Sequence, residues 1–158
     1  MIEQRPIFLF TGSPGAGKTT LAVALAQRFP FGVHIPIDDL RTWVVSGMAH
    51  PIPTWTEETT RQFRLARQAG AHMAKLYNDA GFVVVIDDVI FVDDAAAGFE
   101  IPLQGYRVWK ILVQPSLDTV LLRNAQRTNK SYDTAFLAEP IRALYRSFCE
   151  EPLRSKVG

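Results

Sequence analysis

The stretch that decides the fold lies near the start of the chain and reads Gly12-Ser13-Pro14-Gly15-Ala16-Gly17-Lys18-Thr19. It matches in full the pattern Gly-x-x-x-x-Gly-Lys-[Ser/Thr] of phosphate-binding loops. Its glycines allow the backbone to curl so that successive N–H groups point inward toward an anion. The start of a following helix would add partial positive charge. We therefore expect this loop to bind polyphosphate.

Residues on both sides of the loop predict the strand and the helix that the motif requires. Residues 6–11 form a short apolar run ending at glycine, as expected for a buried strand. Residues 18–28 contain no helix breaker, and Leu21 and Leu25 recur at helical spacing before Pro30 closes the segment. A strand, the loop and a helix in this order are the context in which the pattern is specific for phosphate.

Two side chains of the loop have expected chemical roles. Lys18 would reach the terminal phosphates and act in catalysis, and the Thr19 hydroxyl would contact Mg²⁺. We therefore expect ATP and Mg²⁺ as cofactors. The expected nucleotide-binding residues of this region are Gly12, Ser13, Pro14, Gly15, Ala16, Gly17, Lys18, Thr19 and Thr20.

The rest of the chain alternates between predicted strands and helices. Further strands are expected at residues 33–37, 82–88 and 106–113, because each contains a short apolar run. Four more helices are expected. The first opens at Asp38 and carries Leu40, Trp43 and Val44, and the second is capped by Thr54 or Thr56 and runs as far as Gly81. The third runs from Ser116 to about Arg127, and the fourth buries Ile141, Leu144, Tyr145 and Phe148. This alternation predicts an α/β protein of three layers, with a parallel sheet covered by helices on both faces.

The composition restricts the class of protein. The chain has 158 residues, 47% of them hydrophobic, which suits one domain over residues 1–158 with its own core. A net charge of +1 provides no basic face for nucleic acid, so we expect a small ligand. Cys149 is the only cysteine, which excludes an internal disulfide and indicates a reducing cytoplasm. No apolar run reaches the length of a membrane span, so no membrane partner is expected.

Two adjacent carboxylates follow the predicted second strand, at the sheet end where the phosphate loop lies. An acceptor hydroxyl bound there would need a carboxylate to orient it and to take its proton. We favour Asp38 for this catalytic role, with Asp39 as the alternative. Helix capping is the structural explanation for such residues, but a cap needs only one of the two.

Asp87 and Asp88 end the predicted third strand. Asp87 ends a strand that usually lies next to the first strand, and it could hold Mg²⁺ through water in the manner of a Walker B carboxylate. Asp88 is less well directed toward the loop. A structural role in a turn is the alternative for both residues.

Arg123 and Arg127 lie four residues apart on the helix expected after the fourth strand. Their guanidinium groups could close over the phosphates as part of a lid at residues 123–133, with Lys130 nearby. We expect Arg127 to act in catalysis and Arg123 to bind the nucleotide. A solvated helix face is the alternative for both.

Histidine and aromatic side chains are further candidates for the site. His34 and the other two histidines share no metal-ligand spacing, so no metal beyond Mg²⁺ is expected. His50 lies in a proline-containing loop and is a candidate substrate contact. Trp43, Trp55 and Phe91 are candidates for lining an acceptor pocket, although aromatic side chains more often belong to the core.

With these residues placed, the chain resembles the small P-loop kinases grouped with chloramphenicol phosphotransferase, a group that also holds gluconate kinases, shikimate kinases and zeta toxins. The resemblance spans nearly the whole chain and is strongest at residues 12–19, 37–40 and 85–89.

The resemblance implies roles for particular residues. Asp38 matches the proposed base toward the acceptor hydroxyl, and Arg123 and Arg127 match lid arginines. Where the family has a further lid arginine, this chain has Lys130.

The family also implies that the lid and its following helix lead into a fifth strand, in the strand order 2-3-1-4-5, and then into a loop that touches the adenine. Here residues 150–158 are polar, contain Pro152 and offer no apolar run long enough for a buried strand. We therefore expect four strands in the order 2-3-1-4, with the fourth at an edge. The adenine side of the site would be open, so discrimination between ATP and GTP should be weak. A partner chain, including a second copy that forms a homodimer, could pair with the bare edge.

Taken together, these inferences predict a kinase that uses ATP to phosphorylate a hydroxyl of a small molecule, such as an antibiotic, a sugar or a metabolite. A regulatory module of GTPase type would need Asn-Lys-x-Asp after a strand, whereas residues 129–133 are one residue too long and follow a predicted helix. A nucleoside or polynucleotide kinase, or a toxin-type kinase of a nucleotide sugar, would use the same chemistry and differ only in the acceptor.

Overall fold

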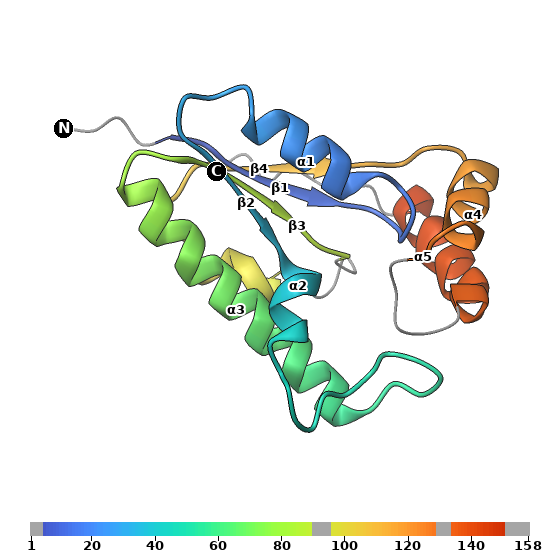
Figure 1. Ribbon diagram of the computed structural model, residues 1–158. Coiled ribbons are helices and arrows are strands. Elements are labelled where there is room, and N and C mark those ends of the chain that lie inside the picture. Colours follow the sequence, from blue (N-terminus) through green and yellow to red (C-terminus); the bar gives the residue numbers. More distant parts are fainter. Residues whose placement is uncertain (1–4, 90–95, 129–133, 151–158) are drawn as a thin grey trace.

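A parallel sheet lies at the centre of the computed structural model, which describes residues 5–89, 96–128 and 134–150 (Figure 1). Its strands are β1 (Ile7–Thr11), β2 (Gly32–Pro36), β3 (Val83–Asp87) and β4 (Val108–Leu112). They pair in the order β2-β3-β1-β4, and every pairing is parallel. The predicted α/β class and strand order are therefore confirmed.

Helices cover both faces of this sheet, which gives the three predicted layers. α1 (Lys18–Ala26) lies on one face, and α2 (Ile37–Thr42) and α3 (Glu57–Asp79) lie on the other. Because successive side chains of a strand point to opposite faces, Ile7 and Leu9 pack in the core beside α3, whereas Phe10 packs with residues of α1. β1 and β3 lie between these two clusters and pair with each other, so their carboxyl ends lie side by side.

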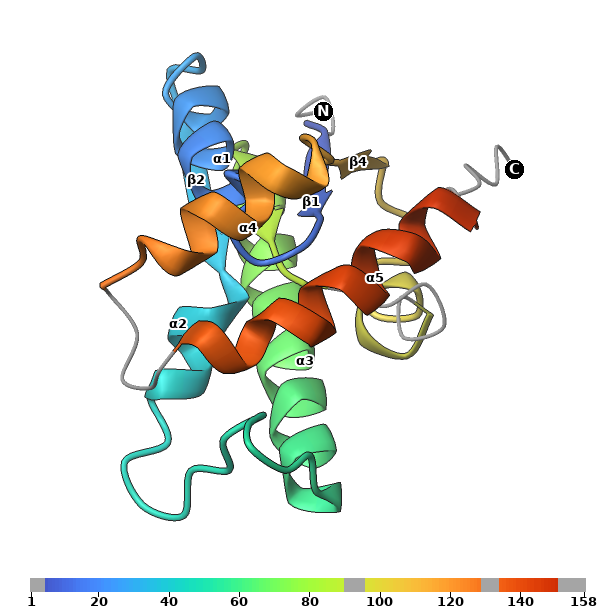
Figure 2. The ribbon, with the colours of Figure 1, turned by 90° about the vertical axis from the view of Figure 1, so that its right-hand side faces the viewer.

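Two further helices lie beyond the carboxyl ends of the strands (Figures 1 and 2). α4 (Leu117–Ala125) follows β4, and α5 (Ala138–Glu150) follows a short 3₁₀ helix, η3 (Thr134–Leu137). Val120, Leu137 and Ile141 form a small buried cluster where these elements meet. This helical region faces the sheet end at which the motif residues emerge.

Two predictions about the helices are wrong, and one helical turn was not predicted. The helix expected to open at Asp38 and to carry Trp43 and Val44 begins at Ile37 and ends at Thr42, so both residues lie past its end, and Trp43 is 67% exposed. α4 ends at Ala125, and Arg127 therefore lies past its end instead of on the same helix face as Arg123. A π-helical turn, η2 (Ala96–Glu100), packs against α3 and has no counterpart in the prediction.

Thr56 is the N-cap of α3, which settles the choice between Thr54 and Thr56. The Thr56 hydroxyl accepts a hydrogen bond from the backbone N–H of Thr59 at 3.1 Å, and the Thr59 hydroxyl accepts one from the backbone N–H of Thr56 at 3.2 Å. This reciprocal pair satisfies donors that the first helical turn would otherwise leave without partners. The cap thus fixes the start of the helix that carries Phe63 and Arg67 toward the site.

Residues that follow Arg146, as far as Glu150, continue α5. Within the described ranges no fifth strand forms, and β4 is one of the two edge strands of the sheet. Pro152 and the rest of residues 151–158 lie outside those ranges. Among the helices described, none combines the length and the apolar character needed to cross a membrane.

Candidate active site

Two glycines let the loop between β1 and α1 pack against its neighbours. Gly12 and Gly15 have φ angles of +150° and +84°. A Cβ atom at Gly12 would lie 2.3 Å from the carbonyl oxygen of Val113, and one at Gly15 would lie 2.8 Å from that of Val120. Both positions therefore require glycine. The loop is consequently packed against the segment after β4 and against α4.

Lys18 starts α1 and its side chain turns back across the loop. Its Nζ donates to the carbonyl oxygens of Gly12, at 2.9 Å, and of Ser13, at 3.0 Å. Burial lowers the pKa of Lys18 to about 8, while the carboxylates of Asp87 and Asp38 act in the opposite direction. A pKa of about 8 leaves the amine mostly charged at neutral pH.

Asp87, the last residue of β3, is contacted at both carboxylate oxygens. Oδ1 accepts a hydrogen bond from the Thr19 hydroxyl at 3.3 Å, and Oδ2 contacts Nε2 of His34. In the register of β2 and β3, His34 pairs with Val85, two residues before Asp87, so the side chains of His34 and Asp87 point to the same face. Oxygen donors from a hydroxyl and a carboxylate are the ligands that Mg²⁺ prefers, so Thr19 and Asp87 fit that ion.

His34 is a site residue that the sequence analysis did not select, because it was judged only by its spacing to the other histidines. No group of three or more His, Cys, Asp or Glu side chains that could hold a metal occurs in the part of the chain that the structure describes. Mg²⁺ at a nucleotide site needs no such group, since water and phosphate oxygens complete its coordination.

Asp88 pairs with α3 on the face opposite to Asp87. Its Oδ2 accepts a hydrogen bond from Nε of Arg67 at 2.6 Å, and Arg67 also donates through Nη2 to the carbonyl oxygen of Val89 at 2.9 Å. Both side chains are buried, and Oδ1 of Asp88 has no hydrogen-bond partner among the described residues. Burial raises the pKa of Asp88 to about 6, although Arg67 opposes this rise. Arg67 is a second residue that the sequence analysis missed.

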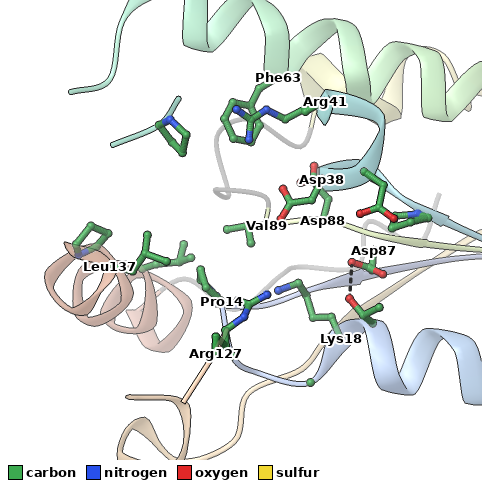
Figure 3. A pocket seen from close by; sticks show the side chains of 18 of the residues that line it. Pro14, Lys18, Asp38, Arg41, Phe63, Asp87, Asp88, Val89, Arg127 and Leu137 are labelled. Atoms are coloured by element: carbon green, nitrogen blue, oxygen red, sulfur yellow. Dashed lines mark hydrogen bonds between the residues drawn. The ribbon is translucent and has the colours of Figure 1, made fainter. Parts of the chain in front are cut away.

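Asp38 and Asp39 lie in the first turn of α2, and both line the cavity described below. Neither is the N-cap of this helix, because Pro36 occupies that position without a side-chain hydrogen bond. Asp38 points into the cavity on the same side as Asp88 (Figure 3). Helix capping therefore does not account for the two carboxylates.

The side chains of Arg123, on α4, and of Arg127, past the end of that helix, both lie near the phosphate loop. Nη1 of Arg123 donates to the carbonyl oxygen of Ala16 at 3.4 Å. The side chain of Arg127 points toward that of Lys18 (Figure 3), and its charge contributes to the lowered pKa of Lys18. Lys130 lies outside the described residues, as does most of the segment that follows Arg127 in the predicted lid.

A cavity of about 910 Å³ connects these groups at the carboxyl end of the sheet (Figure 3). Gly12, Ser13 and Ala16 do not line it, and their carbonyl oxygens instead accept hydrogen bonds from Lys18 and Arg123. The other expected nucleotide-binding residues all line the cavity, namely Pro14, Gly15, Gly17, Lys18, Thr19, Thr20 and Arg123.

The cavity wall away from the phosphate loop is largely apolar. The rings of Trp55 and Phe63 stack with centroids 5.0 Å apart, and the guanidinium of Arg41 lies 3.7 Å from the Phe63 centroid. Ile52 packs against the cluster that contains Leu137, so the loop before α3 meets the helical region along this wall. The wall also includes Pro51, Pro53, Val89, Pro140 and Leu144.

Trp55 is the one candidate among the predicted substrate-contacting side chains that lines the cavity in the described structure. His50 and Trp43 do not line it, so the cavity gives no support to the suggestion that they contact an acceptor. The backbone carbonyl of His50 instead accepts a hydrogen bond from the Thr59 hydroxyl at 3.4 Å. Phe91 lies outside the described residues.

A parallel sheet in the order 2-3-1-4, with a phosphate loop after its first strand and helices on both faces, defines a P-loop kinase-like fold. The chain belongs to the AAA domain family, whose model matches residues 7–152. Among curated proteins, none matches the chain at a significant level.

Several solved structures share this fold. The chain is similar to the tunicamycin resistance protein of Deinococcus radiodurans, with 16% identity and a TM-score of 0.66 over 96% of this chain and 84% of that one. A sugar kinase of Janibacter sp. HTCC2649 is 17% identical, with a TM-score of 0.63 over 98% of this chain and 82% of that one. Shikimate kinase from Acinetobacter baumannii is 17% identical, with a TM-score of 0.54 over 92% and 80%. At these identities the similarity shows the fold.

Proposed function

We propose that the protein is a phosphotransferase that uses ATP and Mg²⁺ to phosphorylate a hydroxyl group of a small molecule. The observation that carries this proposal is the shared cavity, which is lined by Lys18, by Asp87 and by Asp38. A nucleotide switch would need the first two residues, but it would not need a carboxylate such as Asp38 facing the phosphate loop from another element. The kinases among the proteins of the same fold support this proposal.

In this proposal the chain binds the nucleotide through its phosphates. The backbone N–H groups of the loop and the Lys18 amine bind the terminal phosphates, and Arg123 and Arg127 neutralise their charge. Thr19 and Asp87 are the residues that would hold Mg²⁺, which when bound offsets the negative charge of the phosphates.

Asp38 orients the acceptor. Its carboxylate accepts a hydrogen bond from the acceptor hydroxyl and takes the proton as the oxygen bonds to the γ-phosphorus. The bond between that phosphorus and the bridging oxygen breaks, and ADP leaves with the bonding electrons. Most of the rate increase then comes from orientation and charge neutralisation, because phosphoryl transfer needs little covalent help from the protein.

The cavity walls favour an acceptor with an apolar body over a sugar. A polyol needs several polar groups for its hydroxyls, because an unpaired buried hydroxyl is costly. Arg41 is already stacked on Phe63 and bonded to the carbonyl oxygen of Ala49, and Arg67 is paired with Asp88. The surfaces of Trp55 and the other apolar wall residues remain for packing against the acceptor.

Product analysis with a matched pair of lysine variants tests the function. The protein is incubated with ATP, Mg²⁺ and a panel of aromatic alcohols, sugars and nucleosides, and phosphorylated products are sought by mass spectrometry. Lys18→Ala should abolish any product while the fold is retained. Lys75→Ala is the control, because Lys75 lies on α3 near Tyr106 and does not line the cavity. Equal product from the Lys18→Ala variant and the wild type would contradict the proposal.

A further inference from the structure

The carboxylate of Asp87 is held from two separate elements of the fold. Thr19 contacts Oδ1 from α1, and His34 contacts Oδ2 from β2. The side chains of His34 and Asp87 are only 16% and 8% exposed, so water has little access to either group. Each oxygen of this carboxylate therefore has its own protein partner.

Two contacts of this kind determine the orientation of a carboxylate. Rotation about the last side-chain bond of an aspartate has a broad energy minimum, so one hydrogen bond leaves the plane of the group poorly defined. An ionised carboxylate only accepts hydrogen bonds, which requires that Nε2 of His34 carries the hydrogen. With both oxygens engaged, Asp87 presents Oδ1 toward Thr19 and the phosphate loop.

The two partners of Asp87 differ in what else they do. Thr19 belongs to the phosphate loop and is itself a proposed ligand of Mg²⁺. His34 belongs to neither of the two large core clusters, although its strand neighbour Ile35 does. It lines the cavity instead. The polar contact with Asp87 is thus the interaction in the described structure that explains a histidine at this position.

We propose that His34 is a positioning residue that orients Asp87 for the Mg²⁺ ion that accompanies the nucleotide. This inference rests on the proposed function, because that proposal assigns Asp87 to the metal. Partners that orient metal ligands in this way typically contribute roughly tenfold to a hundredfold to metal affinity. His34 should therefore affect the Mg²⁺ dependence of nucleotide binding and leave metal-free nucleotide binding unchanged.

The test compares two substitutions of His34 that differ in one property. His34→Leu removes the ring nitrogens, whereas His34→Gln keeps an N–H donor at a similar distance from the backbone. Binding of a fluorescent ATP analogue is measured first in EDTA and then during a Mg²⁺ titration, and folding is checked by circular dichroism. His72→Leu is the control, because His72 is exposed on α3 and contacts only the carbonyl oxygen of Gln68 among the described residues.

We expect the Mg²⁺ midpoint of the His34→Leu variant to rise about tenfold or more, with the glutamine variant close to the wild type. Affinity in EDTA should be the same in all variants. If the leucine variant does not fold, His34→Asn replaces it, since its shorter amide cannot reach Asp87 and should shift the midpoint in the same direction.

Three other outcomes have distinct meanings. A Mg²⁺ midpoint that is unchanged in the leucine or asparagine variant would overturn the role of His34 alone. Absence of any nucleotide binding by the wild-type protein would instead contradict the proposed function. Equal weakening of binding with and without Mg²⁺ would assign His34 a merely structural role and would also overturn the inference.

Discussion

The side chains of Arg67 and Asp88 form a buried ion pair, with 2.6 Å between Nε and Oδ2, in the wall of the cavity. The pair is incomplete, because Oδ1 of Asp88 is buried without a hydrogen-bond partner among the described residues. Burial is consequently the larger effect, and the pKa of Asp88 rises to about 6 despite the neighbouring guanidinium.

This pKa makes stability depend on pH in a particular direction. Because the pKa is about 6 in the folded chain against an ordinary value of 3.8, the folded state takes up the proton first as the pH falls. The resulting contribution to the free energy of unfolding is complete below pH 3.8 and is lost as the pH rises through about 6. The Asp88→Asn variant lacks this contribution.

Urea titrations at several pH values measure the effect. The free energy of unfolding of the wild type, relative to that of Asp88→Asn, should increase by roughly 1 kcal/mol between pH 7 and pH 5. Parallel pH profiles for the two proteins would show that Asp88 has no raised pKa.

Asp38→Asn tests the residue proposed to take the acceptor proton. The amide keeps the shape of the side chain but cannot act as a base, so kcat should fall by roughly 10² or more while the affinity for ATP stays the same. Asp39→Asn is the matched control, since Asp39 also lines the cavity. If the Asp39 variant loses activity and the Asp38 variant does not, the role belongs to the neighbouring residue.

Thr56→Ala should destabilise the start of α3. The substitution removes the hydroxyl that accepts from the backbone of Thr59, and loss of such a cap costs about 1 kcal/mol. Thr54→Ala provides the comparison, because Thr54 precedes the cap and should have little effect. Chemical denaturation of both variants measures the difference, and equal losses would argue against the cap.

Gly15→Ala should cost more stability than Gly47→Ala. Both glycines have positive φ angles, +84° and +75°, so alanine is strained at either position by about 1 kcal/mol. At Gly15 the new Cβ would also meet the carbonyl oxygen of Val120 at 2.8 Å, whereas at Gly47 nothing lies within 4 Å. The difference between the melting temperatures of the two variants measures the cost of the close contact between the phosphate loop and α4. Equal melting temperatures would show that α4 can shift away from the new Cβ at little cost.

Trp55 can report acceptor binding without turnover. The chain has three tryptophans, and Trp43 and Trp109 are 67% and 55% exposed, so both can be changed to Phe. In that double variant, benzyl alcohol should change the fluorescence of Trp55 in a saturable way, whereas glycerol should not. A saturable response to glycerol alone would contradict the preference for an apolar acceptor.

The parts of the site that can be predicted from sequence are those formed by residues close together in the chain or by the ends of predicted strands. Residues 12–19 contain the glycines, the lysine and the threonine of the phosphate loop in one run. Asp38 and Asp87 are predictable because the ends of parallel strands meet at one edge of a sheet. The strand order was predictable in a different way, through the resemblance to the small P-loop kinases, because apolar runs give the strands but not their order.

His34 and Arg67 illustrate what sequence reasoning could not reach. Their partners Asp87 and Asp88 are 53 and 21 residues away along the chain, so no local pattern connects them. The adjacent carboxylates look equivalent in sequence, yet the two-residue period of a strand directs one toward α1 and the other toward α3. The unpredicted π-helical turn depends on a similar distant contact, because a Cβ at Gly98 would lie 2.8 Å from Cδ of Arg67.

The contact of Ile52 with the cluster around Leu137 has a kinetic consequence. It joins the loop before α3 to the helical region along the cavity wall, without any hydrogen bond or ion pair of the Ile52 side chain itself. In the proposed reaction, a bulky acceptor that entered from this side would have to separate the two segments, and to separate them again in order to leave after phosphorylation. The lifetime of this apolar contact would then limit exchange at the site, so a smaller side chain at position 52 would speed product release at the expense of exposing the reacting phosphate to water.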